Sequence, residues 1–497
     1  MRNEEIRGLS PPTTRWLNFL ILGSGFFLAA LQLGWIPFFR HAWAVNLWAY
    51  QPLAPGLLAI ALAWLMTSSS IRQFLIHSWS RIQNPLDQKE ILAPVSGIIV
   101  SVILWIFRDG GLSPDAKVFG GAILSGYQFI FPDVGTTWII FGLNGFTNAL
   151  GQSDFLLVRL ISCAAGGLTV GLLVSLARRG MLGPIRPFGL AAGLVLSSGL
   201  IRVFAGRVEA YPLLLAGMAS YCWLALRYLK EERGWYLTCL VAGITVWLHA
   251  AAVGLAVSLF FLPRLAQKDL PWSHWFGLLA RGAMVAAGPS IVFYLGLMFL
   301  GNEMTIEATW NRVIEILGGN ETETATRWWV RGRGEAPSIG TDVVLGSWAQ
   351  FKYLGNAAFL LCPSAIPVLG VLMATQGREL VRDRTFLFLA ALCLPLVLYS
   401  FALRPFWGPY DWDLFSITAL SLILLQAYGL NRILKTPLRQ HVAVGLVGLQ
   451  FLFVGAPFFA LGFSPLRDAG PFFIHGYLEA QIGQANTPPP PALAPWL

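Results

Sequence analysis

The chain has 497 residues, of which 56% are hydrophobic and 12% are charged. Soluble domains carry roughly a quarter charged residues, so this chain lacks the polar surface of a soluble or disordered protein. Its apolar residues occur in runs of about 20, the length that crosses a bilayer as a helix. Composition therefore predicts an all-α polytopic membrane protein and excludes soluble enzymes, fibrous proteins and disordered chains.

Hydrophobic runs predict membrane helices along the whole chain, and the run 236–262 is the ambiguous one. This run is long for a single crossing and has His249 at its middle. The other predicted helices cover 16–38, 47–67, 91–107, 155–177, 187–204, 212–229, 277–300, 354–374, 385–403, 414–430 and 441–463.

The distribution of basic residues decides how 236–262 is interpreted, because cytoplasmic loops collect Lys and Arg. If the run forms two short helices that turn near His249, 20 of the 34 basic residues fall in short inner loops. If it crosses once, all the later basic loops face outward. We therefore predict a hairpin, about 13 crossings, a cytoplasmic N-terminus and an outer C-terminus. The inner loops also explain the net charge of +9 without a nucleic-acid partner.

The N-terminal segment and the cysteines give little sign of export or redox chemistry. Residues 1–15 precede a long apolar run without a small-residue cleavage site, which predicts a cytoplasmic tail and a retained first helix. The five cysteines lie within apolar runs and lack CxxC spacing, so we expect small buried residues. Together with the compact loops, these features favour a bacterial inner membrane.

The first candidate site follows the predicted span 91–107, where Asp109 and Asp115 stand among basic residues. A carboxylate at a membrane surface is partly desolvated, which makes it a better proton acceptor. The alternative is a solvated helix end, since Asp and Gly often mark such ends.

The second candidate is the short outer loop that contains Arg207, Glu209 and Tyr211. The acid could orient a sugar hydroxyl or a cation. Arg207 and Glu209 could instead pair with each other or cap the following helix.

The third candidate is the outer segment 404–416, with Arg404, Asp411 and Asp413 around Trp412. Either carboxylate could be a plain helix N-cap. Two carboxylates in an Asp-x-Asp pattern could also hold a divalent cation or bind sugar hydroxyls.

Two further features lie on the same predicted face. His249 stands alone among apolar residues, which disfavours a zinc site. It could be a hydrogen-bonded core residue, or it could face a cavity. Arg327 and Arg331 flank tryptophans in a long outer loop, a pattern that suits a lipid-linked phosphate or a generic interfacial loop.

Together, these motifs resemble the integral-membrane glycosyltransferases of the GT-C superfamily, which includes protein O-mannosyltransferases and the aminoarabinose transferases of lipid A. The resemblance rests on an Asp after a span, the Arg-Leu-Ile-Ser sequence at 159–162 before two glycines, the Gly-Arg-Val-Glu-Ala-Tyr-Pro loop, and Tyr-Asp-Trp-Asp-Leu-Phe at 410–415. It covers about residues 91–430, and Asp115 matches better than Asp109.

The resemblance implies a GT-C-like membrane module at 91–430, with outer loops 108–154 and 301–353 and surface-lying helices in the first loop. Residues 1–90 would form a tail and two accessory helices, and 431–497 a last helix and a Pro-rich outer tail. The two helices at 16–67 and the lack of a bulky soluble domain after the membrane part depart from the family pattern.

The implied activity is inverting transfer of a sugar from a polyprenyl-phosphate donor to a glycan, lipid or protein acceptor on the outer face. Asp115, or Asp109, would be the catalytic base. The remaining residues would bind substrate: Arg207, Glu209, Tyr211, His249, Arg327, Arg331, Arg404, Asp411 and Asp413. The need for a divalent cation is open, because family members differ in metal use.

Two other classes of function are considered. A multi-span transporter or lipid flippase needs a polar path through the membrane, and the predicted spans offer only Arg159, Arg281 and His249. A non-catalytic membrane assembly subunit would keep the fold without activity.

Overall fold

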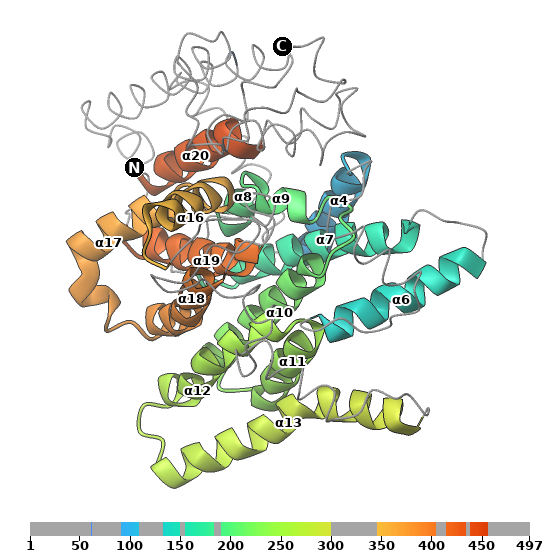
Figure 1. The fold of residues 1–497 in the computed structure, drawn as a ribbon. Coiled ribbons are helices and arrows are strands. Elements are labelled where there is room, and N and C mark those ends of the chain that lie inside the picture. Colours follow the sequence, from blue (N-terminus) through green and yellow to red (C-terminus); the bar gives the residue numbers. More distant parts are fainter. Residues whose placement is uncertain are drawn as a thin grey trace.

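The computed structural model describes residues 91–108, 133–149, 155–182, 190–299, 345–403, 414–433 and 438–455, together with residue 61. The regular elements in these ranges are helices (Figure 1). In chain order they are α4 (Leu92–Ile106), α6 (Val134–Ala149), α7 (Leu156–Arg178), α8 (Leu190–Leu196), α9 (Leu200–Val203), α10 (Tyr211–Glu231), α11 (Trp235–Leu248), η3 (Ala250–Gly254), α12 (Leu255–Ala266), α13 (Trp272–Phe299), α16 (Trp348–Leu361), α17 (Ala365–Leu380), α18 (Arg384–Ala402), α19 (Ser416–Ile433), α20 (Leu438–Gln450) and η5 (Phe451–Gly455).

Several helix ends meet at what we call the loop end of the bundle, and basic turns gather there. Side chains from one turn bond to the backbone or side chains of another at this end. The contacts are Lys230 Nζ to the carbonyl of Arg179 (3.0 Å), Gln267 Nε2 to Glu232 Oε2 (2.9 Å), Arg384 Nη1 to the carbonyl of Ala266 (3.0 Å) and Arg432 Nε to Asp383 Oδ2 (3.5 Å).

The opposite end, which we call the site end, holds the other termini of these helices. It comprises Arg108 after α4, Asp133 before α6, Phe155 before α7, the 206–211 loop before α10, His249 after α11 and Leu403 after α18. The 23 residues of α7 rise about 34 Å, so the two ends lie about one hydrocarbon thickness apart.

The chain turns back at His249, as predicted. His249 has extended backbone angles (φ −157°, ψ 126°) between α11 and η3, so the helix ends there. Tyr221 in the middle of α10 bonds to Ser258 of α12 (2.8 Å), and Gln267 reaches Glu232 at the loop end. Because α11 climbs from that end and α12 returns to it, the two helices form a hairpin with its tip at the site end.

Two predicted spans are broken in the structure, which corrects the single helices expected there. The run 187–204 forms α8 and α9, and at the break the hydroxyls of Ser197 and Ser198 bond back to the carbonyls of Leu194 and Val195. The amide of Gly199 donates instead to the carbonyl of Leu360 (2.8 Å), outside its own helix.

The run 354–374 bends by 94° between α16 and α17. Pro363 follows Cys362, and proline disfavours helical angles in the residue before it. The hydroxyl of Ser364 is held in a chain of bonds, accepting from Gln426 Nε2 and lying 2.8 Å from Gln450 Oε1. These bonds satisfy polar groups that the break places inside the bundle.

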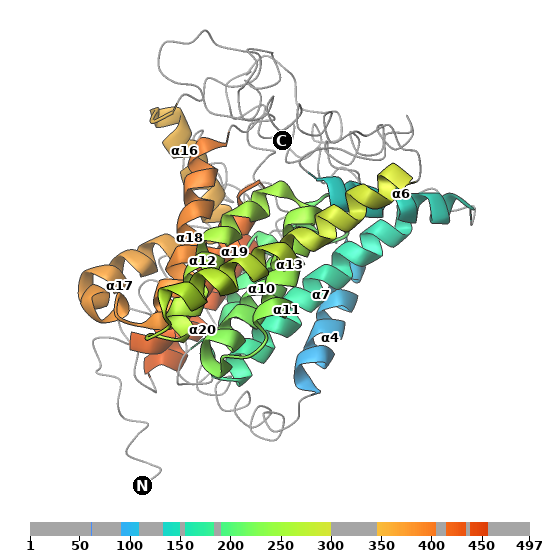
Figure 2. The same ribbon diagram turned by 90° about the horizontal axis from the view of Figure 1, so that it is seen from below.

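Helices α4 and α7 lie side by side (Figure 2), and small residues at their contact let them pack closely. A Cβ atom on Gly97 of α4 would lie 2.8 Å from the carbonyl oxygen of Gly167 of α7. The hydroxyl of Ser101 bonds to the carbonyl of Gly97 (3.0 Å) at the same contact. Small residues let helix backbones approach in this way, a common device in membranes.

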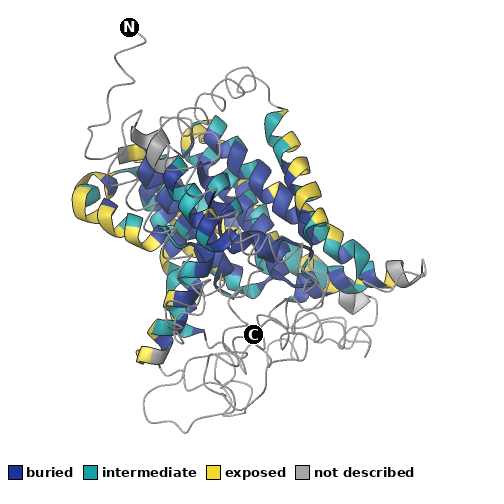
Figure 3. Cartoon of the chain, turned by 90° about the horizontal axis from the view of Figure 1, so that it is seen from above, coloured by how far each residue is buried: buried dark blue, intermediate teal, exposed yellow. Residues whose placement is uncertain are grey.

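The distribution of burial is that of a membrane protein. Four described helices are long and apolar enough to span, namely Leu156–Arg178, Tyr211–Glu231, Trp272–Gly296 and Arg384–Ala402, and the bent α16–α17 pair is a fifth candidate. Buried residues fill the centre and exposed ones lie on outer helices (Figure 3). Large apolar side chains such as Val292 (70% exposed) face outward, while Gln426 and Gln450 are buried. The helix α6 forms where a surface-lying helix was predicted.

We expect Gly243→Ala to destabilise the bundle. Its Cβ atom would overlap the backbone carbonyl of Ala286, so α11 and α13 would have to move apart. Overpacking of this kind costs about 1–3 kcal/mol and should lower the melting temperature of the purified protein. The control is Gly288→Ala in α13, where no atom lies within 4 Å and alanine is the better helix former. Equal melting temperatures would contradict the close contact.

Cysteine labelling tests which side of the membrane each end faces. The five native cysteines are buried, so background labelling should be low. We expect a membrane-impermeant maleimide added to intact cells to label Leu345→Cys, at the exposed start of the α16 segment, and not Arg233→Cys at the loop end. The reverse pattern would overturn the predicted orientation.

Candidate functional site

The described candidate residues Arg207, Glu209, Tyr211 and His249 lie together at the site end. Arg207 and Glu209 belong to the α9–α10 loop, Tyr211 begins α10, and His249 lies at the hairpin tip. The rings of Tyr211 and His249 are 5.6 Å apart. Seven other predicted site residues lie outside the described ranges: Asp109, Asp115, Arg327, Arg331, Arg404, Asp411 and Asp413.

The loop between α9 and α10 turns at Gly206. This residue has φ +75°, a conformation that residues with a Cβ atom adopt with strain. It is also crowded, since a Cβ atom would lie 2.9 Å from Cβ of Arg108 and 3.7 Å from Cβ of Arg159. The loop therefore packs against the end of α4 and the start of α7. Pro212 in the first turn then starts α10 with a suitable φ.

Arg207 and Glu209 form a buried ion pair. Nη1 of Arg207 lies 3.4 Å from Oε2 of Glu209, and the side chains are 11% and 1% exposed. The pairing that the sequence left open is thus present. Among the described residues, however, neither carboxylate oxygen of Glu209 has a hydrogen-bond partner. Since buried polar groups are normally satisfied, Glu209 has capacity to accept hydrogen bonds from a ligand.

Three further arginines converge on this loop. Arg108 stacks on Trp105 at 4.2 Å and donates to its carbonyl (2.9 Å), and its Cβ atom lies against Gly206, as does Cβ of Arg159. Arg202 of α9 is buried and within electrostatic range of Arg207. Among the described residues, four arginines thus lie in or against the loop that holds Glu209, and their positive charge suits an anionic ligand.

Arg202 was missed in the sequence, where it lies unremarked in the predicted span 187–204. An ionisable residue inside an apolar span was the available signal, because such residues are rare and usually functional.

Asp133 was also missed as a site residue in the sequence. Oδ1 of Asp133 lies 2.9 Å from Nε2 of His249, with both side chains largely buried. The direction of this contact is not that of a hydrogen bond, so we describe it as a short electrostatic contact. His249 is therefore a partnered residue at the site end and not an isolated core histidine.

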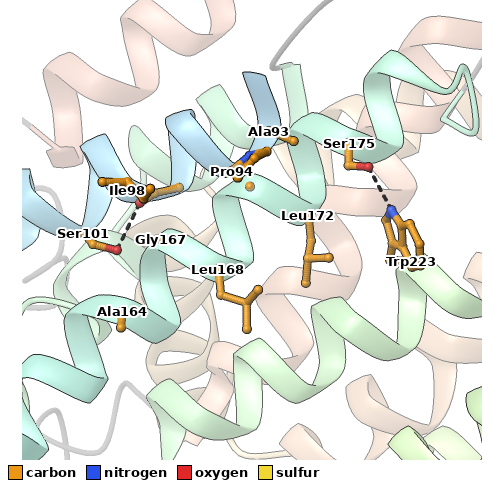
Figure 4. Close-up of a pocket in the computed structure, with 12 residues that line it drawn as sticks. Ala93, Pro94, Ile98, Ser101, Ala164, Gly167, Leu168, Leu172, Ser175 and Trp223 are labelled. Carbon is orange, nitrogen blue, oxygen red and sulfur yellow. Dashed lines mark hydrogen bonds between the residues drawn. The ribbon is translucent and has the colours of Figure 1, made fainter. Parts of the chain in front are cut away.

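A groove opens between α4 and α7 (Figure 4). It measures about 390 Å³ and is lined by apolar and small residues, with Ser101 and Trp223 among the few polar ones. The indole of Trp223 donates to the hydroxyl of Ser175 (3.0 Å) in this lining. Along α4, Ser101, Trp105 and Arg108 are spaced at helical turns, so the groove face continues to the site end.

Among the described residues, no group of three or more His, Cys, Asp or Glu side chains could hold a metal ion. Asp411 and Asp413, the residues predicted for a divalent cation, are outside the described ranges. Metal use therefore stays open.

Comparison with known proteins gives one structural likeness. No protein-family model and no curated protein matches the chain. The fold is similar to the crystal structure of ArnT from Cupriavidus metallidurans bound to undecaprenyl phosphate, with a TM-score of 0.48 and 15% identity over 80% of this chain and 81% of that chain. A likeness at this level does not decide an activity, which depends on the residues of the site.

We expect Gly206→Ala to disturb the site more than a matched substitution elsewhere. The control, Gly234→Ala, has φ +90° but no atom within 4 Å of the new Cβ. Both variants carry backbone strain of about 1 kcal/mol, whereas Gly206→Ala also presses on Arg108. A larger drop in melting temperature for Gly206→Ala is the expected result. Equal drops would show that the loop does not pack against α4.

Proposed function

We propose that the protein is a membrane glycosyltransferase that moves a sugar from a polyprenyl-phosphate donor to an acceptor at the site end, with inversion. The observation that carries this proposal is that Arg108, Arg159, Arg202 and Arg207 lie in or against the loop that holds the buried Glu209. The order of the sequence motifs along the chain resembles that of GT-C enzymes, which supports the same conclusion.

The arginines suit a departing lipid phosphate. When the bond between sugar and phosphate breaks, negative charge grows on the phosphate oxygens, and preorganised cations lower the barrier. Arginine binds phosphate through two parallel N–H donors and stays charged. Arg207 is 11% exposed at its side chain and is held beside Glu209, so it is oriented before substrate arrives. We propose that Glu209 accepts hydrogen bonds from sugar hydroxyls through its unsatisfied oxygens.

The base and the other substrate contacts are assigned by chain position. We propose Asp115, or Asp109, as the base that removes the acceptor proton, since both follow Arg108 closely in sequence. Displacement on the far side of the anomeric carbon then inverts it. Arg404, Asp411 and Asp413 lie between Leu403 and Leu414 and would bind sugar, acceptor or a divalent cation. Arg327 and Arg331 would bind the lipid phosphate.

The groove between α4 and α7 offers a place for the hydrocarbon chain of the donor. It is open, apolar and about 390 Å³ in volume. Its α4 face leads through Trp105 to Arg108, where the phosphate would lie. A lipid whose chain followed this groove would therefore present its head group to the arginine cluster.

We further propose that the site end faces the periplasm or cell exterior of a bacterial inner membrane, with the N-terminus cytoplasmic. Basic turns from five separate helix connections meet at the loop end. Positively charged loops stay in the cytoplasm, which leaves the arginine cluster outside. The acceptor, whether glycan, lipid or protein, would then meet the donor at the outer surface.

Transport is the weaker alternative. The described carboxylates lie at the two ends, with Asp133 and Glu209 at the site end. The buried polar chain of Ser364, Gln426 and Gln450 consists of neutral groups that bond to one another. Coupling to ions or protons usually needs charged groups near mid-membrane. The sugar-transfer assay described below distinguishes an enzyme from a non-catalytic assembly subunit.

The test is sugar transfer by the purified protein in liposomes, using a panel of polyprenyl-phosphate-linked pentoses and hexoses. We expect transfer from at least one donor, and a fall of about 10²-fold or more in kcat/KM for Arg207→Gln. Asp115→Asn should also abolish transfer. The matched control is Arg227→Gln, which removes an exposed ion pair with Glu231 (2.8 Å) at the loop end.

Melting temperatures separate lost chemistry from lost folding. Removing one partner of a buried pair can destabilise a protein by about 3–5 kcal/mol, so Arg207→Gln is compared at a temperature where it stays folded. Unchanged transfer in Arg207→Gln, or no transfer from any donor by the unmodified protein, would overturn the proposal.

A further inference from the structure

The start of α6 is fastened to the tip of the α11–α12 hairpin by several independent contacts. The hydroxyl of Thr136 donates to the carbonyl of Leu248 (3.0 Å). Gly135 packs so closely on Trp247 that a Cβ atom would lie 2.6 Å from the indole. Asp133 adds its contact with His249 at 2.9 Å. The first loop of the site end is thereby joined to an element more than a hundred residues later.

The two nitrogens of His249 have different partners. Nδ1 accepts a hydrogen bond from the amide of Ala251 (3.0 Å), which caps the short helix η3. An acceptor nitrogen carries no proton, so the ring proton is on Nε2, the atom that faces Asp133. The cap thus fixes the tautomer and leaves the protonated nitrogen next to the carboxylate of Asp133.

His249 also contacts the start of α10, next to the loop that contains Arg207 and Glu209. The His249 ring lies 5.6 Å from the ring of Tyr211, which is 9% exposed and begins α10. Glu209 precedes Tyr211 by two residues and is itself buried. A displacement of His249 would therefore shift Tyr211, and through the backbone it would shift Glu209 and Arg207.

We propose that Asp133 and His249 are a positioning pair: their contact sets the hairpin tip against Tyr211 and so holds Arg207 and Glu209 in their binding geometry. This rests on the proposed function, since it assumes that Arg207 and Glu209 bind the donor. Neither residue is assigned a proton-transfer step, because both ring nitrogens of His249 are occupied within the protein. A histidine that acted as base would need one of them turned toward substrate.

Two substitutions of His249 separate its two contacts. In His249→Asn the short side chain keeps an oxygen that can accept from the amide of Ala251, and asparagine is a favoured N-cap, but its amide does not reach Asp133. In His249→Gln the longer amide can reach Asp133 as Nε2 does, while the cap is lost. Asp133→Ala removes the partner directly.

Three readouts apply to the full-length protein in detergent or liposomes: the Kd for polyprenyl phosphate without sugar, the KM and kcat of sugar transfer, and the melting temperature. We expect His249→Asn and Asp133→Ala to raise Kd and donor KM about tenfold or more, since small misplacements of binding groups have large effects. His249→Gln should stay within about threefold of the unmodified protein. In Asp133→Ala combined with His249→Asn, the losses should be smaller than the sum of the single effects.

The opposite order of effects in the two His249 variants would overturn the proposed role of the pair. If His249→Asn binds polyprenyl phosphate normally while His249→Gln does not, His249 acts only as a helix cap. Melting temperatures that fall in step with affinity in all variants, including His249→Gln, would show a purely structural role. If the unmodified protein binds no polyprenyl phosphate, the proposed function fails, and with it the role given to the pair.

Discussion

Burying charge in an apolar bundle is energetically costly, and the arrangement of the site end follows from that cost. A buried charge has to be matched by an opposite charge or by hydrogen bonds. Glu209 is paired with Arg207 at 3.4 Å, and Oδ1 of Asp133 lies 2.9 Å from Nε2 of His249. Arg108, Arg159 and Arg202 add further positive charge beside the pair of Arg207 and Glu209. A lipid phosphate is attracted to such a concentration of positive charge, so the proposed substrate and the electrostatics of the site agree.

The same need for polar satisfaction shapes the backbone. Breaks in apolar helices leave amides and carbonyls without helical partners, and three breaks within the described ranges have local replacements. At His249 the side chain caps the next helix, and at Ser364 the hydroxyl lies within a chain of glutamines. Gly199 donates across to Leu360. These breaks let short helices turn and bring distant loops to one end of the bundle.

Prediction from sequence was reliable where it used the length of apolar runs and the distribution of charge among the loops. Long apolar runs gave most of the described helices, and the basic loops predicted the hairpin at His249 that the structure contains. It was less reliable for 187–204 and 354–374, where hydropathy alone does not register a serine pair or a proline as a helix break. It also left open whether Arg207 and Glu209 pair, since either a capping or a pairing geometry fits that spacing.

Sequence by itself therefore determined that the protein is helical, apolar and charged mainly in its loops, because these properties follow from composition and the length of each run. Only the tertiary structure decided that Asp133 meets His249 and that Arg108, Arg159 and Arg202 gather around the loop of Arg207 and Glu209. Asp133 and His249 are far apart in the chain, as are Arg108 and Arg159 from the 206–209 loop, and nothing local encodes their distances. The packing of helices at small residues such as Gly97 and Gly167 sets which ends meet, and so which charges share a site.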